Sequence, residues 1–365
     1  MNIAFYGSSL LSSYWNGAAT YYRGLLSDLA RRGHQITFYE PDAFDRQQHR
    51  DMEPPDWAEV RVWPPNQDAL REVVAEATAA DVVVKASGVG VFDDALMDGV
   101  MQAARSGALR IFWDVDAPAT LAEMRAAGPG HPLRRALPAL DLVLTYGGGP
   151  PVVEAYEGFG ARRCVPIYNA LDPATHYPVP PDARFEADLS FLGNRLPDRE
   201  ARVEEFFLRP ATQLSGRRFL IGGNGWDGKE MPANVRHIGH VYTREHNAFN
   251  TSPLAVLNVA RDSMAAVGFS PATRVFEAAG AGACLITDAW VGLELFLENG
   301  KEVLVARDGT DVAAYVAALT PERARMIGLA ARQRILSEHT YARRGAAVDT
   351  LLREEAACKR HRSAA

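Results

Sequence analysis

Short apolar runs alternate with longer amphipathic stretches along the first half of the chain. The run NIAFY at 2–6 predicts a strand, and the amphipathic stretch 17–32 predicts a helix that ends before Gly33. Further strands are expected at 35–39, 81–85, 109–113 and 141–145, with helices at 67–79 and 93–106. Strands that alternate with helices predict a parallel sheet with right-handed helical crossovers.

A proline-rich stretch at 171–188 interrupts this alternation. Four prolines fall within 173–181, and they cannot lie inside a central strand or helix, so we interpret the stretch as an interdomain linker. The alternation then resumes, with strands expected at 189–193, 218–222, 235–238, 254–259, 283–287 and 302–305 and helices at 197–207, 272–280, 310–319 and 321–336. The fold class is therefore α/β, with two doubly wound, Rossmann-like domains at 1–170 and 189–345 and a C-terminal helix or tail at 346–365.

Composition is that of an ordinary globular protein. The 365 residues are 47% apolar and 23% charged, so each half can bury a core of its own. The formal net charge of −6 gives no positive field for nucleic acid, and no apolar run is long enough for a transmembrane segment. Cys164, Cys284 and Cys358 are far apart, which indicates neither a disulfide framework nor a Cys/His zinc site and favours a cytoplasmic location.

Two loops that follow predicted strands of the second half hold candidate chemistry, because ligands of open parallel sheets bind beyond the carboxyl ends of the strands. In the first loop, Gly193 and Asn194 precede Arg195, whose guanidinium can donate two hydrogen bonds to a diphosphate. In the second, Gly223 and Asn224 belong to a glycine-rich run whose backbone amides can face a ligand. A plain turn with a surface arginine stays open for the first loop, and a flexible turn for the second.

The segment 268–296 adds the start of a helix. Arg274 and Glu277 open this helix, whose N-terminus carries a partial positive charge that suits a diphosphate. The Glu277 carboxylate can accept hydrogen bonds from both hydroxyls of a ribose. The alternative is that Glu277 caps the helix or forms a salt bridge.

The run RVFEAAGAGACLITD…GLELF in this segment resembles the donor-binding segment of GT-B glycosyltransferases of the group-1 (GT4-like) type. It resembles more closely that of the CgeB-like spore-maturation glycosyltransferases. The segments LSFLGNR, VRHIGHVYTREH and IFWDVDAPATL and the opening IAFYGSSLLSSYWNGAATYYRGLLSDLARRGHQITFYEPD are similar to the same family in order and spacing. The resemblance covers most of the chain. It implies two domains that face each other across a cleft, a UDP-, GDP- or dTDP-sugar as donor, and an acceptor that stays unidentified.

The resemblance also implies roles for individual residues of the second domain. Glu277 would bind the donor ribose, Arg195 and Arg274 would hold the diphosphate, and His240 and Val241 would lie near the nucleobase. Enzymes of this kind usually need no bound metal, because arginines and a helix N-terminus neutralise the leaving diphosphate. We therefore expect neither a metal nor a bound cofactor.

The first half supplies candidates for the acceptor side. The resemblance implies that Gly17 allows a close approach at the cleft, and Tyr14, Trp15 and Asn16 of the same loop either contact the acceptor or pack against the other domain. Asp116 ends a D-x-D tripeptide after a predicted strand and is a candidate general base or acceptor ligand. A helix N-cap role for Asp116 is an equal alternative, and metal binding is a third.

Three other functions stay open. A GT-B-type nucleotide-sugar epimerase would need several carboxylates around the sugar. A non-catalytic nucleotide-sugar-binding protein remains possible because Phe269 stands where retaining group-1 enzymes often carry a second glutamate, which also leaves the stereochemical outcome open. An NAD-dependent oxidoreductase would use Gly88 and Gly90, but Asp93 stands where the dinucleotide-binding motif needs a third glycine.

Overall fold

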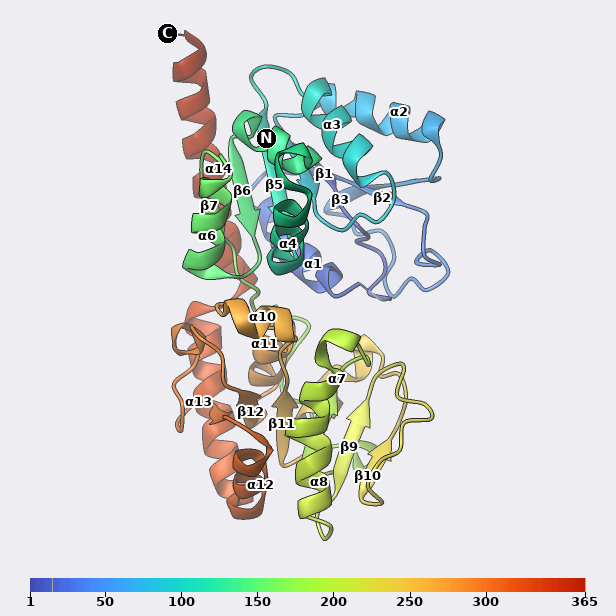
Figure 1. The fold of residues 1–365 in the computed structure, drawn as a ribbon, viewed down its shortest axis with the longest axis vertical. Coiled ribbons are helices and arrows are strands. Elements are labelled where there is room, and N and C mark those ends of the chain that lie inside the picture. The colour runs from blue at the N-terminus through green and yellow to red at the C-terminus, as the bar shows by residue number, and fades with distance from the viewer. Residues whose placement is uncertain (15, 365) are drawn as a thin grey trace. The chain divides into compact units, whose positions relative to one another are not determined.

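The computed structural model describes residues 1–14 and 16–364, and these divide into two compact units (Figure 1). The first unit comprises Met1–Tyr168 and the segment from Tyr341 onward, and the second comprises Asn169–Thr340. This division differs from the expected one at both ends of the second domain. The proline-rich stretch 171–188 belongs to the second unit, and the C-terminal segment folds with the first unit.

The described part of the first unit contains a seven-stranded parallel sheet in the order β3-β2-β1-β4-β5-β6-β7. The order reverses between β1 and β4, since β1 pairs with β2 on one side and with β4 on the other. The strands are β1 (Asn2–Tyr6), β2 (Gln35–Pro41), β3 (Ala58–Trp63), β4 (Val82–Ala86), β5 (Leu109–Asp114), β6 (Leu142–Thr145) and β7 (Cys164–Pro166). The expected strands are confirmed, and β3 and β7, which the sequence analysis did not predict, lie at the two edges.

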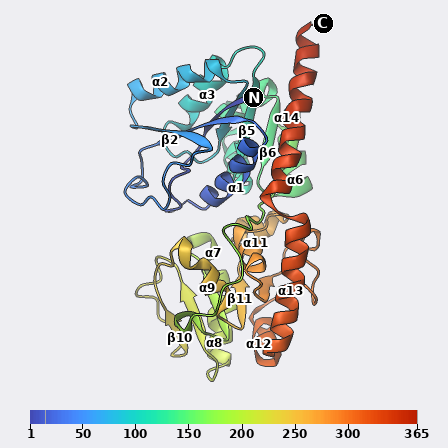
Figure 2. The same cartoon turned by 180° about the vertical axis from the view of Figure 1, so that it is seen from behind.

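Helices flank this sheet, and the last of them comes from the C-terminus. They are α1 (Ala18–Arg31), α2 (Gln67–Glu76), α3 (Asp93–Ala103), α4 (Ala117–Ala127), α5 (Pro132–Ala136), α6 (Gly149–Gly158) and α14 (Tyr341–Ala364). Helix α14 packs against α1 (Figure 2). Gly24 makes this packing possible, because a Cβ there would lie 2.1 Å from the Tyr341 ring. His34 Nε2 also lies within hydrogen-bond distance of Asp349 Oδ1, at 2.7 Å.

Among the described residues, every helix is too short or too polar to span a bilayer.

The second unit, as far as the structure describes it, contains a six-stranded parallel sheet in the order β10-β9-β8-β11-β12-β13. The order reverses between β8 and β11. The strands are β8 (Leu189–Leu192), β9 (Phe219–Gly222), β10 (Val235–His237), β11 (Ala255–Asn258), β12 (Leu285–Asp288) and β13 (Leu304–Ala306). All six strands expected from the sequence are confirmed to within two residues at each end.

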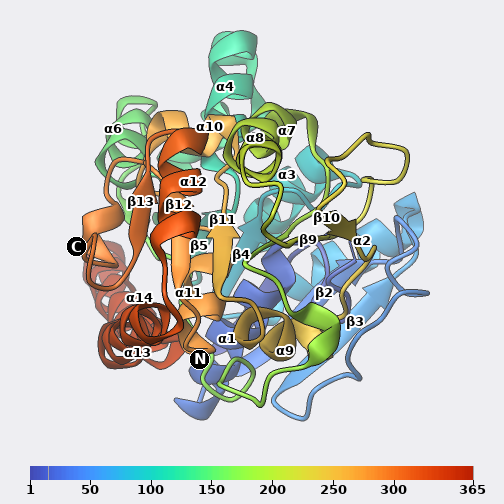
Figure 3. The same cartoon turned by 90° about the horizontal axis from the view of Figure 1, so that it is seen from below.

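Helices cover both faces of the second sheet (Figure 3). They are α7 (Pro197–Val203), which continues as a π-helix (Glu204–Leu208) into α8 (Arg209–Gln213), then α9 (His246–Thr251), α10 (Asp262–Val267), α11 (Thr273–Gly280), α12 (Gly309–Ala318) and α13 (Pro321–Glu338). Alternate strand residues face opposite layers. Phe219 and Ile221 belong to the core beneath α8 and α12, whereas Leu220 packs with Phe249 of α9.

Candidate functional site

The point of strand-order reversal in the second sheet lies between β8 and β11, where ligands of open parallel sheets bind. Asp198, in the segment after β8, links this segment by hydrogen bonds to the loop after β11. Its Oδ2 accepts hydrogen bonds from Arg261 Nε at 3.0 Å and Ser263 Oγ at 2.6 Å, and its Oδ1 accepts one from the Ser263 amide at 3.2 Å. A single carboxylate therefore connects the segments that follow β8 and β11.

The predicted glycines Gly193 and Gly223 follow β8 and β9, and Gly223 lies close to the backbone of Gly193. The Gly223 amide donates to the Gly239 carbonyl at 2.7 Å, and a Cβ on Gly223, whose φ is +122°, would lie 2.3 Å from the Gly193 oxygen. The Trp226 indole donates to that same oxygen at 2.7 Å. Tight packing between loops thus explains the glycine at 223, where any side chain would collide with backbone.

The neighbouring polar residues are also engaged with one another. Asn194 Oδ1 accepts a hydrogen bond from the Asn224 amide, and the Arg195 amide donates to the Asn224 carbonyl, both at 2.9 Å. The Arg195 guanidinium donates to Glu200 at 2.7 Å, and this hydrogen bond raises its pKa. Glu200 is shared with Lys229 at 3.0 Å. The Arg195 charge is therefore neutralised by a surface carboxylate.

Arg199, which the sequence analysis did not select, is the more deeply buried arginine of this loop. It donates to the Asn194 carbonyl and lies 5.6 Å above the Phe191 ring, and its Nε makes no hydrogen bond among the described residues. Burial, together with the nearby charges of Arg261 and Arg274, lowers the pKa of Arg199 to about 10. Three guanidinium groups thus gather at the point of strand-order reversal.

Helix α11 brings Arg274 and Glu277 to the same edge of the sheet. Arg274 Nη1 lies 3.5 Å from Glu277 Oε2 and 3.3 Å from Asn250 Oδ1, while its Nε makes no hydrogen bond in the described part of the chain. Glu277 is 6% exposed. Burial would raise the pKa of Glu277, but the neighbouring His176, Arg274 and His246 hold this pKa below its ordinary value. Glu277 is therefore an ionised acceptor at neutral pH.

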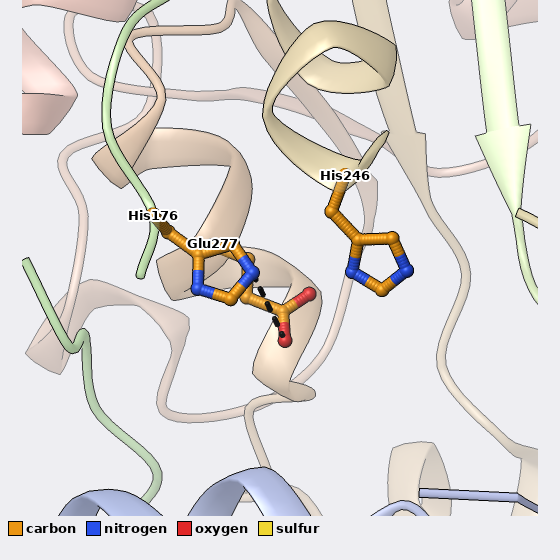
Figure 4. A group of neighbouring side chains, drawn as sticks. All are labelled: His176, His246 and Glu277. Carbon is orange, nitrogen blue, oxygen red and sulfur yellow. Dashed lines mark ion pairs between the residues drawn. The ribbon is translucent and has the colours of Figure 1, made fainter. Parts of the chain in front are cut away.

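Two histidines flank the Glu277 carboxylate, as Figure 4 shows. His176 Nε2 lies 3.9 Å from Glu277 Oε1, and one ligand atom of each of His176, His246 and Glu277 lies within 4.8 Å of the others. Burial lowers the pKa of His246 to about 4, so this imidazole is neutral at neutral pH. The sequence analysis found no metal-binding cluster, because the two histidines are far apart along the chain.

The two nucleobase candidates differ in their surroundings. Val241 is buried in an apolar cluster with Phe185, Leu220 and Phe249. His240 is exposed, and its ring meets Tyr242 edge-on at 4.7 Å between ring centroids. Of the pair, only the His240 side chain lies at the surface.

In the first unit, the loop candidates after β1 also differ in burial. Asn16 is buried, and its Nδ2 donates to the carbonyls of Ser9 and Ser12 at 2.9 and 3.0 Å, so the amide holds the loop together. Gly17 is exposed at the N-cap of α1, where an added Cβ would meet no atom within 4 Å. Trp15 lies outside the described residues.

The D-x-D tripeptide divides into one buried and one less buried carboxyl. Asp114 accepts hydrogen bonds from Tyr156 at 2.5 Å and Thr120 at 3.0 Å, and burial raises its pKa. Asp116 occupies the N-cap position of α4, but its side chain makes no capping hydrogen bond. Asp114 is thus part of the core, and Asp116 is the member that remains a candidate for chemistry.

In the first unit, the backbone amides of the loops after β1 and β4 donate hydrogen bonds to carboxylates of the same unit. Glu40 Oε2 accepts hydrogen bonds from the amides of Leu10 and Leu11 at 2.5 and 3.2 Å. Asp93 accepts one from the Gly90 amide at 2.6 Å and pairs with the buried Lys85. The amides that a dinucleotide phosphate would need are already in use.

Two tandem parallel sheets, each with one reversal of strand order, define the GT-B fold, and solved structures confirm this assignment. The HepE protein of Anabaena, in complex with UDP and glucose, aligns with a TM-score of 0.68 and 13% identity over 97% of this chain and 100% of that one. Sucrose-phosphate synthase of Thermosynechococcus elongatus aligns with a TM-score of 0.69 and 13% identity over 98% and 100%. The T4 phage protein BGT, in complex with its UDP-glucose substrate, gives 0.56 and 11% over 99% and 98%.

Residues 199–352 match the family model described as glycosyl transferase-like. The match begins at Arg199 and includes α11 with Arg274 and Glu277. No curated protein matches the sequence. The family match supports a transferase, and the solved structures show the GT-B fold.

Proposed function

We propose that the protein is a glycosyltransferase that transfers a hexosyl group from a nucleoside-diphosphate sugar, bound at the carboxyl edge of the second sheet. The observation that carries the proposal is the placement of the half-buried Arg274 beside the buried carboxylate of Glu277, with the half-buried Arg199 near Arg274. This arrangement offers positive charge for a diphosphate and an acceptor for ribose hydroxyls within one site. We further propose membership in the CgeB-like group, on the segments that resemble it.

The diphosphate would lie against Arg199 and Arg274. The Nε of each is buried and makes no hydrogen bond within the described residues, so each could donate to a phosphate oxygen once the neighbouring side chains moved aside. When the bond between sugar and phosphate breaks, negative charge grows on the leaving diphosphate. Fixed cations at that position stabilise the transition state more than the ground state, which is how they would accelerate transfer without a metal.

The ribose would be held by Glu277. An ionised carboxylate accepts hydrogen bonds through both oxygens, and charge-assisted bonds of this kind are about twice as strong as neutral ones. The nucleobase would then lie toward His240, whose side chain is exposed in the loop after β10. Val241 would contribute through its backbone, because its side chain is buried in the core.

The remaining loop residues would act on the donor indirectly. Gly193 leaves room for Arg199, since a Cβ there would lie 2.8 Å from the Arg199 guanidinium. Asn194 accepts a hydrogen bond from the same group through its carbonyl. We therefore assign the diphosphate to Arg199 and Arg274, and give Arg195 a minor role because Glu200 neutralises it.

The donor would carry uridine. Similar structures contain UDP or UDP-glucose, and this favours a UDP-sugar over GDP- and dTDP-sugars. On the acceptor side we propose Asp116 as the general base, with Asn16 and Gly17 shaping the loop nearby. A dinucleotide is disfavoured, because Glu40 and Asp93 occupy the backbone amides of the first unit's loops.

A panel of nucleotides tests the proposal. UDP, GDP, dTDP and NAD would each be added in EDTA while thermal unfolding is followed, and the release of UDP from UDP-sugars would be assayed in parallel. A nucleotide at 100 times its dissociation constant stabilises the folded protein by about 2.7 kcal/mol. We expect this effect with UDP. Stabilisation by NAD alone would overturn the proposal, and UDP binding without any UDP release would favour a non-catalytic binding protein.

A further inference from the structure

We propose that His176, His246 and Glu277 form a site for one divalent transition-metal ion of the Zn²⁺ class, and that the ion and the nucleotide compete for Glu277. Metal binding stands on these three side chains alone. The competition also rests on the proposed function, which gives the same carboxylate to the ribose. The sequence analysis expected no metal, so this proposal departs from it.

Packing of the proline-rich segment against α11 brings His176 to Glu277. Gly280 permits a close approach, because a Cβ there would lie 2.3 Å from a Leu171 methyl group and 3.1 Å from the His176 carbonyl. Asn247, the residue after His246, holds both sides of the same segment. Its Nδ2 donates to the Thr175 carbonyl at 2.9 Å and its Oδ1 accepts from the Tyr177 amide at 3.2 Å. The two histidines are therefore brought together by structure outside the cluster.

Each histidine has one ring nitrogen engaged by the protein and the other left for a ligand. His176 Nδ1 lies 2.9 Å from Thr175 Oγ1, and His246 Nε2 lies 3.3 Å from the Val241 carbonyl. The opposite nitrogens, His176 Nε2 and His246 Nδ1, are buried and make no hydrogen bond among the described residues. A hydrogen bond on the far nitrogen fixes the tautomer and orientation of metal-binding histidines. This outer support is already built here.

The ligand set and its spacing suit zinc. Two imidazoles and one carboxylate with a fourth position open is a set that binds Zn²⁺, with metal–ligand distances of roughly 2.0–2.2 Å and hence about 3.3 Å between tetrahedral ligand atoms. The His176 Nε2 to Glu277 Oε1 distance is 3.9 Å, and all three ligand atoms lie within 4.8 Å. Side-chain rotation by His246 would close the remaining gap.

Arg274 sets the strength of the site. Its Nη1 faces Glu277 Oε2, whereas Oε1 faces His176. A metal on Oε1 would therefore leave the Arg274 ion pair in place but would feel its positive charge. Bound metal also withdraws Glu277 from the ribose hydroxyls, so each ligand weakens the other by the same factor.

Zinc titration of matched variants tests the site. Metal-free protein would be titrated with ZnCl₂ against a chromophoric chelator, with folding checked by circular dichroism. His246→Gln keeps a donor for the Val241 carbonyl and removes the free nitrogen, and His176→Asn does the same toward Thr175. We expect one Zn²⁺ per wild-type chain, an affinity at least about tenfold weaker in both variants, and no change in the exposed control His361→Gln. Equal Zn²⁺ binding by all four proteins, or no saturable binding by the wild type, would overturn the site.

Two further experiments distinguish metal binding from its competition with the nucleotide. Arg274→Gln removes the cation beside the carboxylate and is expected to strengthen Zn²⁺ binding by about tenfold or more, while a purely structural disturbance would weaken it. Saturating Zn²⁺ is expected to weaken UDP binding by about tenfold relative to EDTA, and an unchanged UDP affinity would overturn the competition. A protein that binds Zn²⁺ through both histidines but no UDP in EDTA would support the metal site and overturn the proposed function.

Discussion

The loops after the first strand of each sheet occupy the same place in the fold but have opposite electrostatics. After β1, the carboxylate of Glu40 already accepts hydrogen bonds from the amides of Leu10 and Leu11. After β8, the half-buried Arg199 and the nearby Arg274 each have a buried Nε that makes no hydrogen bond within the described residues. In the first loop a carboxylate thus engages the backbone amides, whereas in the second two guanidinium nitrogens lack a hydrogen-bond partner among the described residues. This difference, and not the fold, is the reason we propose the second unit for the diphosphate.

The largest expected effect is the difference in UDP affinity between two glutamate-to-glutamine substitutions, one in each unit. Glu277→Gln removes the charge that would accept two ribose hydroxyls, and we expect UDP binding to weaken by about 4 kcal/mol, close to 1,000-fold, because hydrogen bonds to charged groups contribute about 1.5–3 kcal/mol each. Glu40→Gln is expected to lower the free energy of unfolding and leave the UDP dissociation constant of the folded protein unchanged. Isothermal titration calorimetry in EDTA measures both; equal losses of affinity would contradict the contrast.

Replacement of a glycine by alanine should destabilise the protein where the loop is tightly packed and have little effect where the loop is open. Gly223→Ala would drive a Cβ to 2.3 Å from the Gly193 carbonyl at a φ of +122°, so we expect a loss of about 2–3 kcal/mol in the free energy of unfolding. Gly17→Ala enters open space and is expected to change stability by a few tenths of a kcal/mol, in the stabilising direction. Urea unfolding measures both, and a neutral Gly223→Ala would show that the loops after β8 and β9 do not pack as described.

Two arginines four positions apart refine the assignment within the second unit. Arg199→Met is expected to weaken UDP binding by about 2 kcal/mol, roughly 30-fold, because a charge-assisted bond to the diphosphate is lost. Arg195→Met should change UDP binding less than about threefold, because its charge is neutralised by Glu200 at the surface. If calorimetry gave the reverse order, the diphosphate would belong to Arg195.

The smallest expected effect is a pH dependence at Asp198. Burial acts to raise its pKa, but hydrogen bonds from Ser263 and the charge of Arg261 hold the folded-state pKa below the ordinary value near 3.8. A depressed carboxyl pKa adds stability above the unfolded pKa, and this stability is lost as pH falls below about 4. Asp198→Asn should therefore reduce the loss in the free energy of unfolding at acid pH by at most about 1 kcal/mol, because solvent screens the Asp198 charge. An unchanged loss at acid pH would contradict the pinning of the two loops.

The sequence predicted those parts of the site that depend on local pattern. Arg274 and Glu277 were selected because they open a helix between a glycine-containing loop and a buried strand, and the structure places both at the sheet edge. The sequence could not show which arginine of the β8 loop is buried. The first turn of α7 decides this, since non-helical dihedrals at Asp198 direct its carboxylate to Ser263 and leave Arg199 beneath the loop.

Long-range packing accounts for what the sequence analysis missed. His176 reaches Glu277 only because Gly280 accepts Leu171 against α11 and Asn247 holds the segment on α9. None of these contacts leaves a periodic signal in the sequence. The segment 346–365 is likewise expected from the sequence only as a C-terminal helix or tail, and its packing on α1 depends on the space that Gly24 leaves for Tyr341.

A structure of the protein with UDP tests the central claim most directly. We predict that both ribose hydroxyls lie within hydrogen-bond distance of the Glu277 carboxylate and that the diphosphate contacts the guanidinium groups of Arg199 and Arg274. A diphosphate bound at the loop after β1, or held by Arg195 with Arg199 still covered, would contradict the account.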